Sequence, residues 1–518
     1  MEELSLILEL LKNKLRKLPL NRIKQLTLSR DKAKAKATKE AQRARNLAKK
    51  LARRDARIIT LEGRLDLVLA ENAQLKMRAQ AAVAPSSSHL IDFQLAIMMR
   101  ILCVMLILRG VISFKSCPRI LQVCRDQGLL PQGAWIPHFT SIIRWTQRYG
   151  LYKLNAVTTR DKPWVAILDQ SIGIGLQKVL VILRVSLDHF TQYDRALSLE
   201  DCECIQIEVR ESWTGETVCK ALHETFKKTG NPRIILKDQG SDLARGVRLW
   251  RESVGKSLCR VVDDIGHYSA NALKSEFSKL KAFNTLLLKV RSATRKLKQS
   301  SFFYLAPPKL RTAGRFMSIS RLAKWAETML SWSQTPNADP EIPRVIRRAT
   351  GGFSKIKTFI DRFNRTAQAV NKINEILKNK GLNQKTYHEA KTILNTLPKR
   401  SGTRKRLQKW LNRGLDTQCQ LGIKQTPIPV STDIIESLFG KFKMQTQRQN
   451  KAEINQMVLT IPAMTGINTR EDIAKALGQV QQKDLLKWAK EHIPKTRQAI
   501  RRSNRELARL KDVRLSSA

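Results

Sequence analysis

The stretch IILKDQGSDLARGV, residues 234–247, decides the fold because its pattern changes in the middle. An apolar run leads through Lys237 into Asp238, and a glycine and a second acid, Asp242, follow. Beyond them, apolar residues recur three and four positions apart, which is typical of a helix. The stretch therefore predicts a strand that ends in an acid and a helix that begins just after it.

Short strands and helices alternate on both sides of this stretch. The pattern predicts strands at 164–171, 177–187, 202–209, 232–240 and 257–264, and helices at 215–230 and 243–254. Three strands followed by helix, strand, helix and strand is the order of a ribonuclease H-like fold with a mixed central sheet. Helical patterns dominate from 268 to 425. We therefore expect an α/β core in a chain that is α+β overall.

Two acids end strands that this fold places side by side. Asp169 lies near the end of the first strand, WVAILDQS (164–171), and Asp238 ends the fourth. Paired carboxylates are ligands for Mg²⁺, and two ions about 4 Å apart can activate a water or a 3′-hydroxyl and stabilise a leaving oxygen. The pair predicts a site for two Mg²⁺ ions, which Mn²⁺ can replace. Taken singly, an acid after a strand is most often a turn residue or a helix cap, so the prediction rests on the two acids together.

A third acid is expected from a later helix, in PVSTDIIESLFGKFKMQTQ (429–447). Its apolar face is predicted to hold Ile435, Leu438, Phe439 and Phe442. Glu436 lies on another face and is predicted to complete the metal ligands, with Lys441 and Lys443 holding the DNA backbone. Asp433 and Glu436 also fit a helix capping box, and in that case Asp264 would be the third ligand.

The charge of the chain points to its partner. The sequence holds 95 Lys and Arg against 44 Asp and Glu, a formal net charge of +51. Such an excess is typical of a surface that binds a polyanion, so DNA is the expected partner. Charge does not distinguish an enzyme from a passive DNA-binding protein. The arrangement of the acids must distinguish these two classes.

A heptad pattern between residues 35 and 80 predicts one long helix that pairs with a second copy. The predicted dimer seam consists of Leu51, Ile58, Leu61, Leu65, Val68, Asn72 and Leu75. A buried Asn in such a seam selects one register of a parallel dimer. The alternative is a helix that packs on its own chain. We expect a homodimer or a higher homo-oligomer.

Two helical patterns between 112 and 154, separated by a loop with Gly128, Pro131 and Gly133, fit a helix-turn-helix module. On the second helix, roughly 137–149, Arg144, Gln147 and Arg148 are expected on polar sides. Arg and Gln read base edges in a major groove, so these three residues are candidates for DNA contact. An ordinary helical subdomain fits the same pattern.

The chain resembles DDE-type transposases of the bacterial insertion-sequence kind. Asp169, Asp238 and Glu436 match the triad of that family in order and strand context. The resemblance implies metal-dependent cleavage at terminal inverted repeats, followed by 3′-hydroxyl attack on target DNA. It covers about 164–264 and 429–447. The 198 residues from Asp238 to Glu436 resemble the subgroup with a large helical insertion before the last acid, as in hAT-like families.

Two smaller motifs extend the resemblance. Asp264-Ile-Gly-His267 is similar to an element that follows the second acid in several of these families. His267 would then support a metal ligand or the scissile phosphate, although a histidine at a helix start fits the same position. Glu436 with Lys443 resembles the Glu-x6-Lys part of an insertion-sequence signature, whose preceding Tyr and Arg are here Pro429 and Thr432.

The cysteines and the most apolar run limit other functions. Eight Cys without a CxxC pair do not predict structural zinc, and they fit reduced thiols in the cytosol. The run AIMMRILCVMLILRGVI (96–112) carries Arg100 and Arg109 and is too short to span a membrane, so a buried helix is expected. We expect a cytoplasmic protein associated with a bacterial nucleoid and not with membranes.

The predicted organisation follows from these segments. It comprises a basic coiled-coil region (1–83), a linker (84–88), a helix-turn-helix-like domain (89–158), the first part of the ribonuclease H-like core (159–274), a helical insertion (275–428), the core helix with the last acid (429–450) and a basic helical C-terminal region (451–518). Two other functions fit this organisation. A non-catalytic dimeric DNA-binding protein would not need Asp169 or Asp238, and a nuclease on the same fold would cut DNA without joining it.

Overall fold

The computed structural model describes residues 87–159, 161–174, 177–192, 196–309, 315–334, 341–423, 426–446, 454–495 and 500–505, with isolated positions between 9 and 63. The chain divides into two compact units, Met1–Gln94 and Leu95–Ala518. All seven residues of the predicted dimer seam lie outside the described residues. The predicted linker 84–88 is wrong at its end, because Ser87 and Ser88 already belong to helix α3 (Ser87–Leu108).

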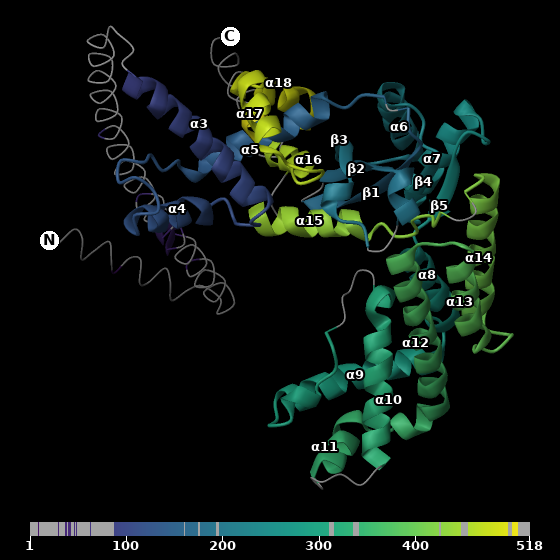
Figure 1. The fold of residues 1–518 in the computed structure, drawn as a ribbon. Helices are drawn as coiled ribbons and strands as arrows, with labels where there is room; N and C mark the ends of the chain where they lie inside the picture. Colours follow the sequence, from purple (N-terminus) through teal and green to yellow (C-terminus); the bar gives the residue numbers. More distant parts are fainter. Residues whose placement is uncertain are drawn as a thin grey trace. The chain divides into compact units, whose positions relative to one another are not determined.

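A sheet of five strands lies at the centre of the second unit (Figure 1). The strands are β1 (Trp164–Ile174), β2 (Gln177–Ser186), β3 (Glu203–Arg210), β4 (Ile234–Lys237) and β5 (Arg260–Asp263). Their order is β3-β2-β1-β4-β5. β1 pairs antiparallel with β2 and parallel with β4, and β4 pairs parallel with β5. The predicted mixed sheet is therefore present, with β4 and β5 shorter than expected.

Helices cover both faces of this sheet, since its strands are apolar on both sides. On one face, Trp164, Ala166 and Leu168 of β1 share a buried cluster with α6 (Gly215–Thr229) and α7 (Ser241–Val254). On the other face, Val165 and Ile167 belong to a larger cluster that includes α15 (Asp433–Thr446). Successive residues of β1 thus point to opposite layers, as expected for a strand.

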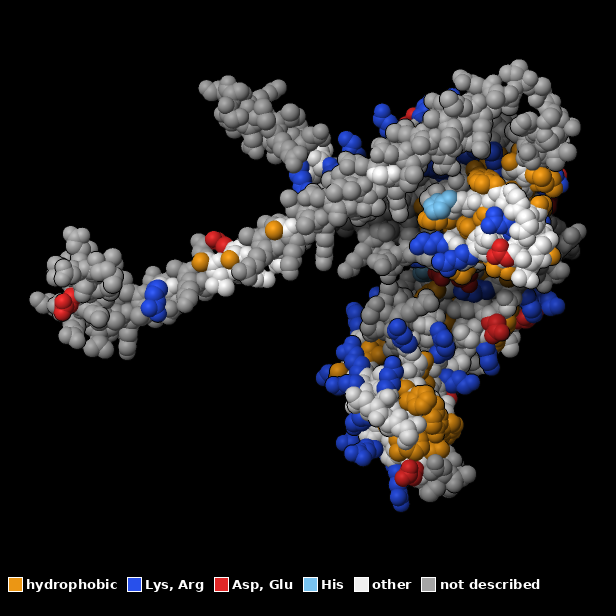
Figure 2. All heavy atoms as spheres, turned by 90° about the vertical axis from the view of Figure 1, so that its left-hand side faces the viewer, with side chains coloured by type: hydrophobic (Ala, Val, Ile, Leu, Met, Phe, Trp, Pro, Cys, Tyr) orange, Lys and Arg blue, Asp and Glu red, His pale blue; other side chains and the backbone are white. Residues whose placement is uncertain are grey.

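Among the described residues between β5 and α15, the chain forms seven α-helices. They are α8 (Ile265–Phe277), α9 (Lys281–Lys298), α10 (Ile319–Gln334), α11 (Glu341–Thr350), α12 (Lys357–Lys380), α13 (Gln384–Asn395) and α14 (Gly402–Gln420). Aromatic rings join α8, α9 and α12, with Phe363 at 5.0 Å from Phe277 and 5.6 Å from Phe283 between ring centroids. Figure 2 shows Lys and Arg side chains spread over the visible side of α9 to α12, with few acids among them.

Helices from both ends of the second unit pack on one another. α4 (Ser116–Asp126) and α5 (Phe139–Asn155) precede the sheet, and α16 (Thr460–Ala463), α17 (Arg470–Gln479) and α18 (Gln482–His492) follow α15. α5 lies against all three of the later helices. The apolar run 96–112 falls largely in α3, and Cys103, Val104 and Ile107 there are fully buried. Within the described residues, no helix is long and apolar enough to cross a membrane.

Candidate active site

Asp169 and Asp238 lie at the same edge of the sheet. The parallel register of β1 and β4 ends with Leu168 opposite Lys237, and the two acids are the next residues in their chains. Neighbouring strands are about 4.8 Å apart, so this register places the two backbones side by side. The predicted convergence of these acids therefore agrees with the strand pairing.

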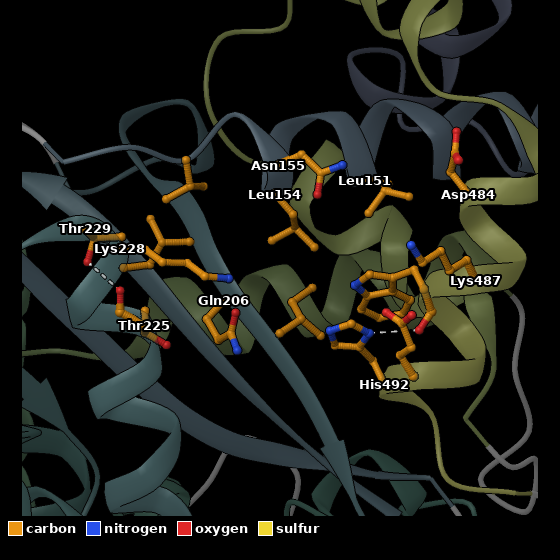
Figure 3. A pocket seen from close by; sticks show the side chains of 15 residues that line it. Leu151, Leu154, Asn155, Gln206, Thr225, Lys228, Thr229, Asp484, Lys487 and His492 are labelled. Carbon is orange, nitrogen blue, oxygen red and sulfur yellow. Dashed lines mark hydrogen bonds between the residues drawn. The ribbon is translucent and has the colours of Figure 1, made fainter.

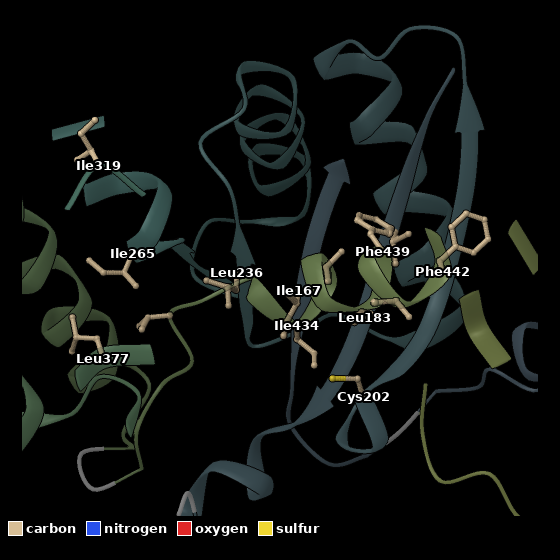
Figure 4. Packing of buried hydrophobic residues seen from close by; sticks show 14 of the residues in the cluster. Ile167, Leu183, Cys202, Leu236, Ile265, Ile319, Leu377, Ile434, Phe439 and Phe442 are labelled. Atoms are coloured by element: carbon tan, nitrogen blue, oxygen red, sulfur yellow. The ribbon is translucent and has the colours of Figure 1, made fainter. Parts of the chain in front are cut away.

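Both acids belong to the face that α15 covers. Asp169 pairs across the sheet with Val181, whose side chain is buried in the α15 cluster. Asp238 follows Ile234 and Leu236 by even steps, and these two residues also pack in that cluster. Figure 4 shows Ile167 and Leu236 in the same cluster as side chains of α15. The carboxylates are thus expected to face the helix that carries Glu436.

The two carboxylates differ in their surroundings. Asp169 is 4% exposed, and its Oδ1 accepts a hydrogen bond of 2.6 Å from the N–H of Gln170. Asp238 is half-buried, and its Oδ1 accepts a bond of 2.9 Å from the N–H of Gly240, just before α7 begins. The second bond is the Asx-type turn that the acid–glycine spacing allows.

Glu436 lies on the exposed side of α15. The predicted apolar face is confirmed, because Ile435, Leu438 and Phe442 are buried. Glu436 itself is exposed in the first turn. The competing capping-box interpretation does not hold, since α15 begins at Asp433 and the carboxylate of Asp433 binds Lys378 Nζ at 2.5 Å.

Asp264 connects α8 to the start of α15. It is 1% exposed, and its Oδ1 accepts bonds from the N–H and Nδ1 of His267, at 2.6 and 3.0 Å. Its Oδ2 accepts bonds from the N–H and Oγ1 of Thr432, at 2.7 and 3.2 Å. The N–H of Ile265 also donates to the carbonyl of Val430 at 2.9 Å. Asp264 therefore fixes the segment that leads into Glu436.

Three carboxylates influence the charge of His267. Its hydrogen bond to Asp264 is the main cause that raises the pKa of His267 to about 9, against the opposing effect of burial. The charges of Asp238 and Glu436 raise it further, so both carboxylates lie close enough to act on the ring. Burial alone would raise the pKa of Asp264, but its bonds to His267 and Thr432 hold it below its ordinary value.

Lys378 of α12 is a member of this site that the sequence did not reveal. Its ammonium binds Asp433, the first residue of α15. The same Nζ would lie 3.2 Å from a Cβ added at Gly266, in the first turn of α8. A cation beside a helix N-terminus opposes the helix dipole, so the nearby carboxylates must compensate it. No motif marks Lys378, because only the fold brings α12 to this place.

The described residues do not form a closed metal site. In the described part of the chain, no three His, Cys, Asp or Glu side chains converge closely enough to hold a metal ion. Carboxylate oxygens are nevertheless the ligands that Mg²⁺ prefers, and Mg²⁺ commonly takes one or two carboxylates while waters and substrate phosphates complete its shell. Asp169 and Asp238, which follow adjacent paired residues of β1 and β4, are carboxylates of that kind.

Two of the predicted DNA contacts on α5 face the protein. Gln147 is 4% exposed and lies 3.6 Å from the Met457 sulfur. The guanidinium of Arg148 donates to the carbonyls of Leu477 and Val480. These contacts correct the expectation that Gln147 and Arg148 point into a DNA groove, because α5 is covered on that side by the helices that follow α15.

Of the other three residues predicted to contact DNA, two are exposed and one binds within the protein. Arg144 and Lys443 are exposed and remain available to DNA. Lys441 donates to the carbonyl of Leu108 at 2.8 Å, and burial lowers its pKa. Lys441 therefore holds the end of α3, which is a structural role.

A cavity of 390 Å³ lies between α5, β3, α6 and α18, and none of the predicted metal ligands lines it (Figure 3). Its cations, Lys228 and Lys487, are matched by the acids Asp484 and Glu491. Such a balanced lining does not select a ligand of one charge.

Comparison with known proteins adds little to this geometry. No family model matches the sequence, and no curated protein matches it. A solved structure described as a Drosophila P element transposase strand transfer complex is similar with a TM-score of 0.35 and 13% identity. The similarity covers 69% of this chain and 89% of that chain. At these values, the arrangement of residues in this chain must support any function by itself.

Proposed function

We propose that this chain is a DNA transposase of the DDE type, which cleaves DNA at transposon ends and joins it to target DNA. One observation carries the proposal. Asp169 and Asp238 directly follow the last paired residues of β1 and β4 on one face of the sheet, and α15, which covers that face, carries the exposed Glu436 in its first turn. A β3-β2-β1-β4-β5 order with these strand directions supports the ribonuclease H-like core expected from the sequence.

The proposed roles follow from burial and charge. Asp169, Asp238 and Glu436 would hold two Mg²⁺ ions, or Mn²⁺ in their place, with Asp169 the most deeply buried of the three carboxylates. The bound ions would supply an activated water or 3′-hydroxyl and stabilisation of the leaving oxygen. His267 and Lys378 place positive charge beside the acids, where a DNA phosphate would lie.

The net charge of +51 supports DNA as the substrate. The positive charge attracts the phosphate backbone of any DNA sequence, whereas the acids provide a site at which a phosphodiester bond can be broken. A passive DNA-binding protein has no use for carboxylates at a site that DNA phosphates approach, because like charges repel. This contrast favours the enzyme over the passive binder.

The direct test is Mg²⁺- or Mn²⁺-dependent cleavage of duplexes that carry the DNA flanking the gene. Asp238→Asn should lower the cleavage rate by about 100-fold or more while DNA binding persists. Asp242→Asn, an acid four residues further in the first turn of α7, is the matched control and should cleave normally. Equal cleavage by all three proteins would favour a non-catalytic DNA-binding protein.

A second assay separates a transposase from a nuclease. Cleaved ends with a free 3′-hydroxyl are incubated with a target plasmid, and joined products are sequenced. A transposase should insert the ends into the plasmid, and Asp169→Asn and Glu436→Gln should lose joining together with cleavage. Cleavage without any joined product would identify a nuclease on the same fold.

A further inference from the structure

A strongly basic groove lies on α14, apart from the acids. It encloses 630 Å³, and five of its seven lining residues are cationic: Lys399, Arg404, Lys405, Lys409 and Arg413. The other two, Gln408 and Asn412, are neutral and polar. No acid lines this part of the described chain. Like charges one helical turn apart repel, so this cluster of cations raises the free energy of the folded chain unless an anion is bound.

The floor of the groove is held in place by hydrogen bonds. Arg404 donates to the carbonyl of Leu397 at 2.5 Å and to Asn395 Oδ1 at 2.8 Å, which fixes it to the end of α13. Gln408 donates to Asn412 Oδ1 at 2.8 Å. These contacts order the floor before any partner binds.

The cations at the rim of the groove are Lys399, Lys405, Lys409 and Arg413. In the chain as described, no carboxylate is hydrogen-bonded or ion-paired to Lys399, Lys405, Lys409 or Arg413. Lys405, Lys409 and Arg413 are exposed and follow one another by four residues along α14. A helix rises 1.5 Å per residue, so this row is about 12 Å long. The row offers three cations, so it can contact about three phosphates of a duplex.

The lining also selects the kind of nucleic acid. No aromatic side chain lines the groove, so it offers no surface on which an unpaired base can stack. Cations on a polar floor instead suit the regular phosphates of a duplex. Contacts of this kind fix position on the DNA and do not read its sequence.

The groove lies close to the strand ends that carry the acids. On the same helix, Trp410 Nε1 donates to the carbonyl of Asp263, the last residue of β5, at 3.1 Å. Tyr268 of α8 donates to the carbonyl of Arg406 at 3.3 Å. A helix with its side chains is about 10 Å wide, so the groove is about one helix away from that sheet edge.

We propose that the groove formed by Lys399, Lys405, Lys409 and Arg413 holds the phosphate backbone of duplex DNA beside the site of the acids. This inference deepens the proposed function and rests on it for the choice of DNA. The groove positions a duplex, and the acids act on it.

The test is the salt dependence of binding to a labelled DNA duplex of about 30 base pairs, measured in EDTA. The wild-type chain is compared with the triple variant Lys405→Ala, Lys409→Ala, Arg413→Ala. The matched control is Lys483→Ala, Lys487→Ala, Lys490→Ala, which removes three exposed cations from α18. Each lost phosphate contact lowers the slope of log K against log salt by about 0.9, so the groove variant should lose about 2 to 3 and the control less than 1.

Three outcomes would overturn the inference. The slope is unchanged in the groove variant, both triples lose the same amount, or the groove variant loses affinity for an RNA duplex more strongly than for DNA. Because all three substituted residues are exposed, the variant should fold, and charge reversal with Lys405→Glu and Lys409→Glu provides a second variant with a larger expected loss. EDTA prevents cleavage, so a failure of the proposed catalysis does not affect this result.

Discussion

At the scale of single residues, Asp264 and His267 explain how a charged site is kept stable. Each oxygen of Asp264 accepts two hydrogen bonds, so the buried carboxylate is fully satisfied although it lies in the core. This saturation argues against Asp264 as the third metal ligand, because a metal would have to displace bonds that hold α15. Asp264 instead positions the helix that carries Glu436.

His267 makes the stability of the fold depend on pH. Its folded pKa of about 9 exceeds the ordinary value of 6.5, so folding favours the protonated ring. The stabilisation is complete below about pH 6.5 and is lost as the pH rises through 9. We expect His267→Gln to lower the free energy of unfolding by on the order of 2 kcal/mol at pH 6, since the ring is about a third exposed and partly screened.

The measurement is urea denaturation of both proteins in EDTA at pH 6, 7.5 and 9.5. The difference between wild type and His267→Gln should shrink steadily across this range. Other titrating groups, such as Lys153, whose pKa burial lowers to about 8, occur in both proteins and cancel in the difference. A constant difference at all three pH values would mean that His267 is not held in its charged form by Asp264.

At the scale of helices and strands, α15 and α5 show what the sequence could and could not predict. The buried side of α15 follows from the spacing of Ile435, Leu438 and Phe442, because only one face of this helix is apolar. α5 also has polar positions, but Arg148 covers carbonyls of a distant helix. A sequence pattern does not tell solvent from a carbonyl as the partner of a long polar side chain.

The packing of α5 on the helices after α15 depends on one glycine. A Cβ at Gly150 would lie 1.7 Å from the carbonyl oxygen of Leu459, so the two segments touch backbone to backbone. Gly150→Ala should therefore lower the free energy of unfolding by about 3 kcal/mol, because neither backbone can move aside cheaply. Urea denaturation at neutral pH measures this change.

Gly440 provides the matched control for this substitution. It lies within α15, and a Cβ there would meet nothing within 4 Å. Gly440→Ala should raise the free energy of unfolding by up to about 1 kcal/mol, because alanine favours the helix and nothing blocks it. If both substitutions stabilise the protein, then α5 and Leu459 are not in contact. The packing of α5 that buries Gln147 and Arg148 would then be wrong as well.

At the scale of the whole molecule, the parts of the proposed site come from distant segments. Asp169, Asp238 and Glu436 could be proposed from the sequence because the first two follow buried apolar runs and the third lies on a helix with one apolar face. Lys378 and the groove on α14 could not, since they belong to helices whose positions depend on packing. Basic residues are so frequent in this chain that charge alone does not distinguish a binding groove from a solvated surface.

The largest assembly that the sequence predicts is a dimer through the heptad seam at 51–75. Leu65 occupies a core position of this seam, and an aspartate there would bury an unpaired charge in each copy. We expect the wild-type chain to have twice the mass of one chain in light scattering at micromolar concentration, and Leu65→Asp to be a monomer. Ala70→Asp, on the outer side of the predicted helix, should remain a dimer.

A dimer carries two α14 grooves, so Leu65→Asp should also weaken binding to a long duplex more than to a short one. If the wild-type chain is already a monomer, the heptad residues must pack on their own chain, and the two grooves would have to be brought together by DNA alone.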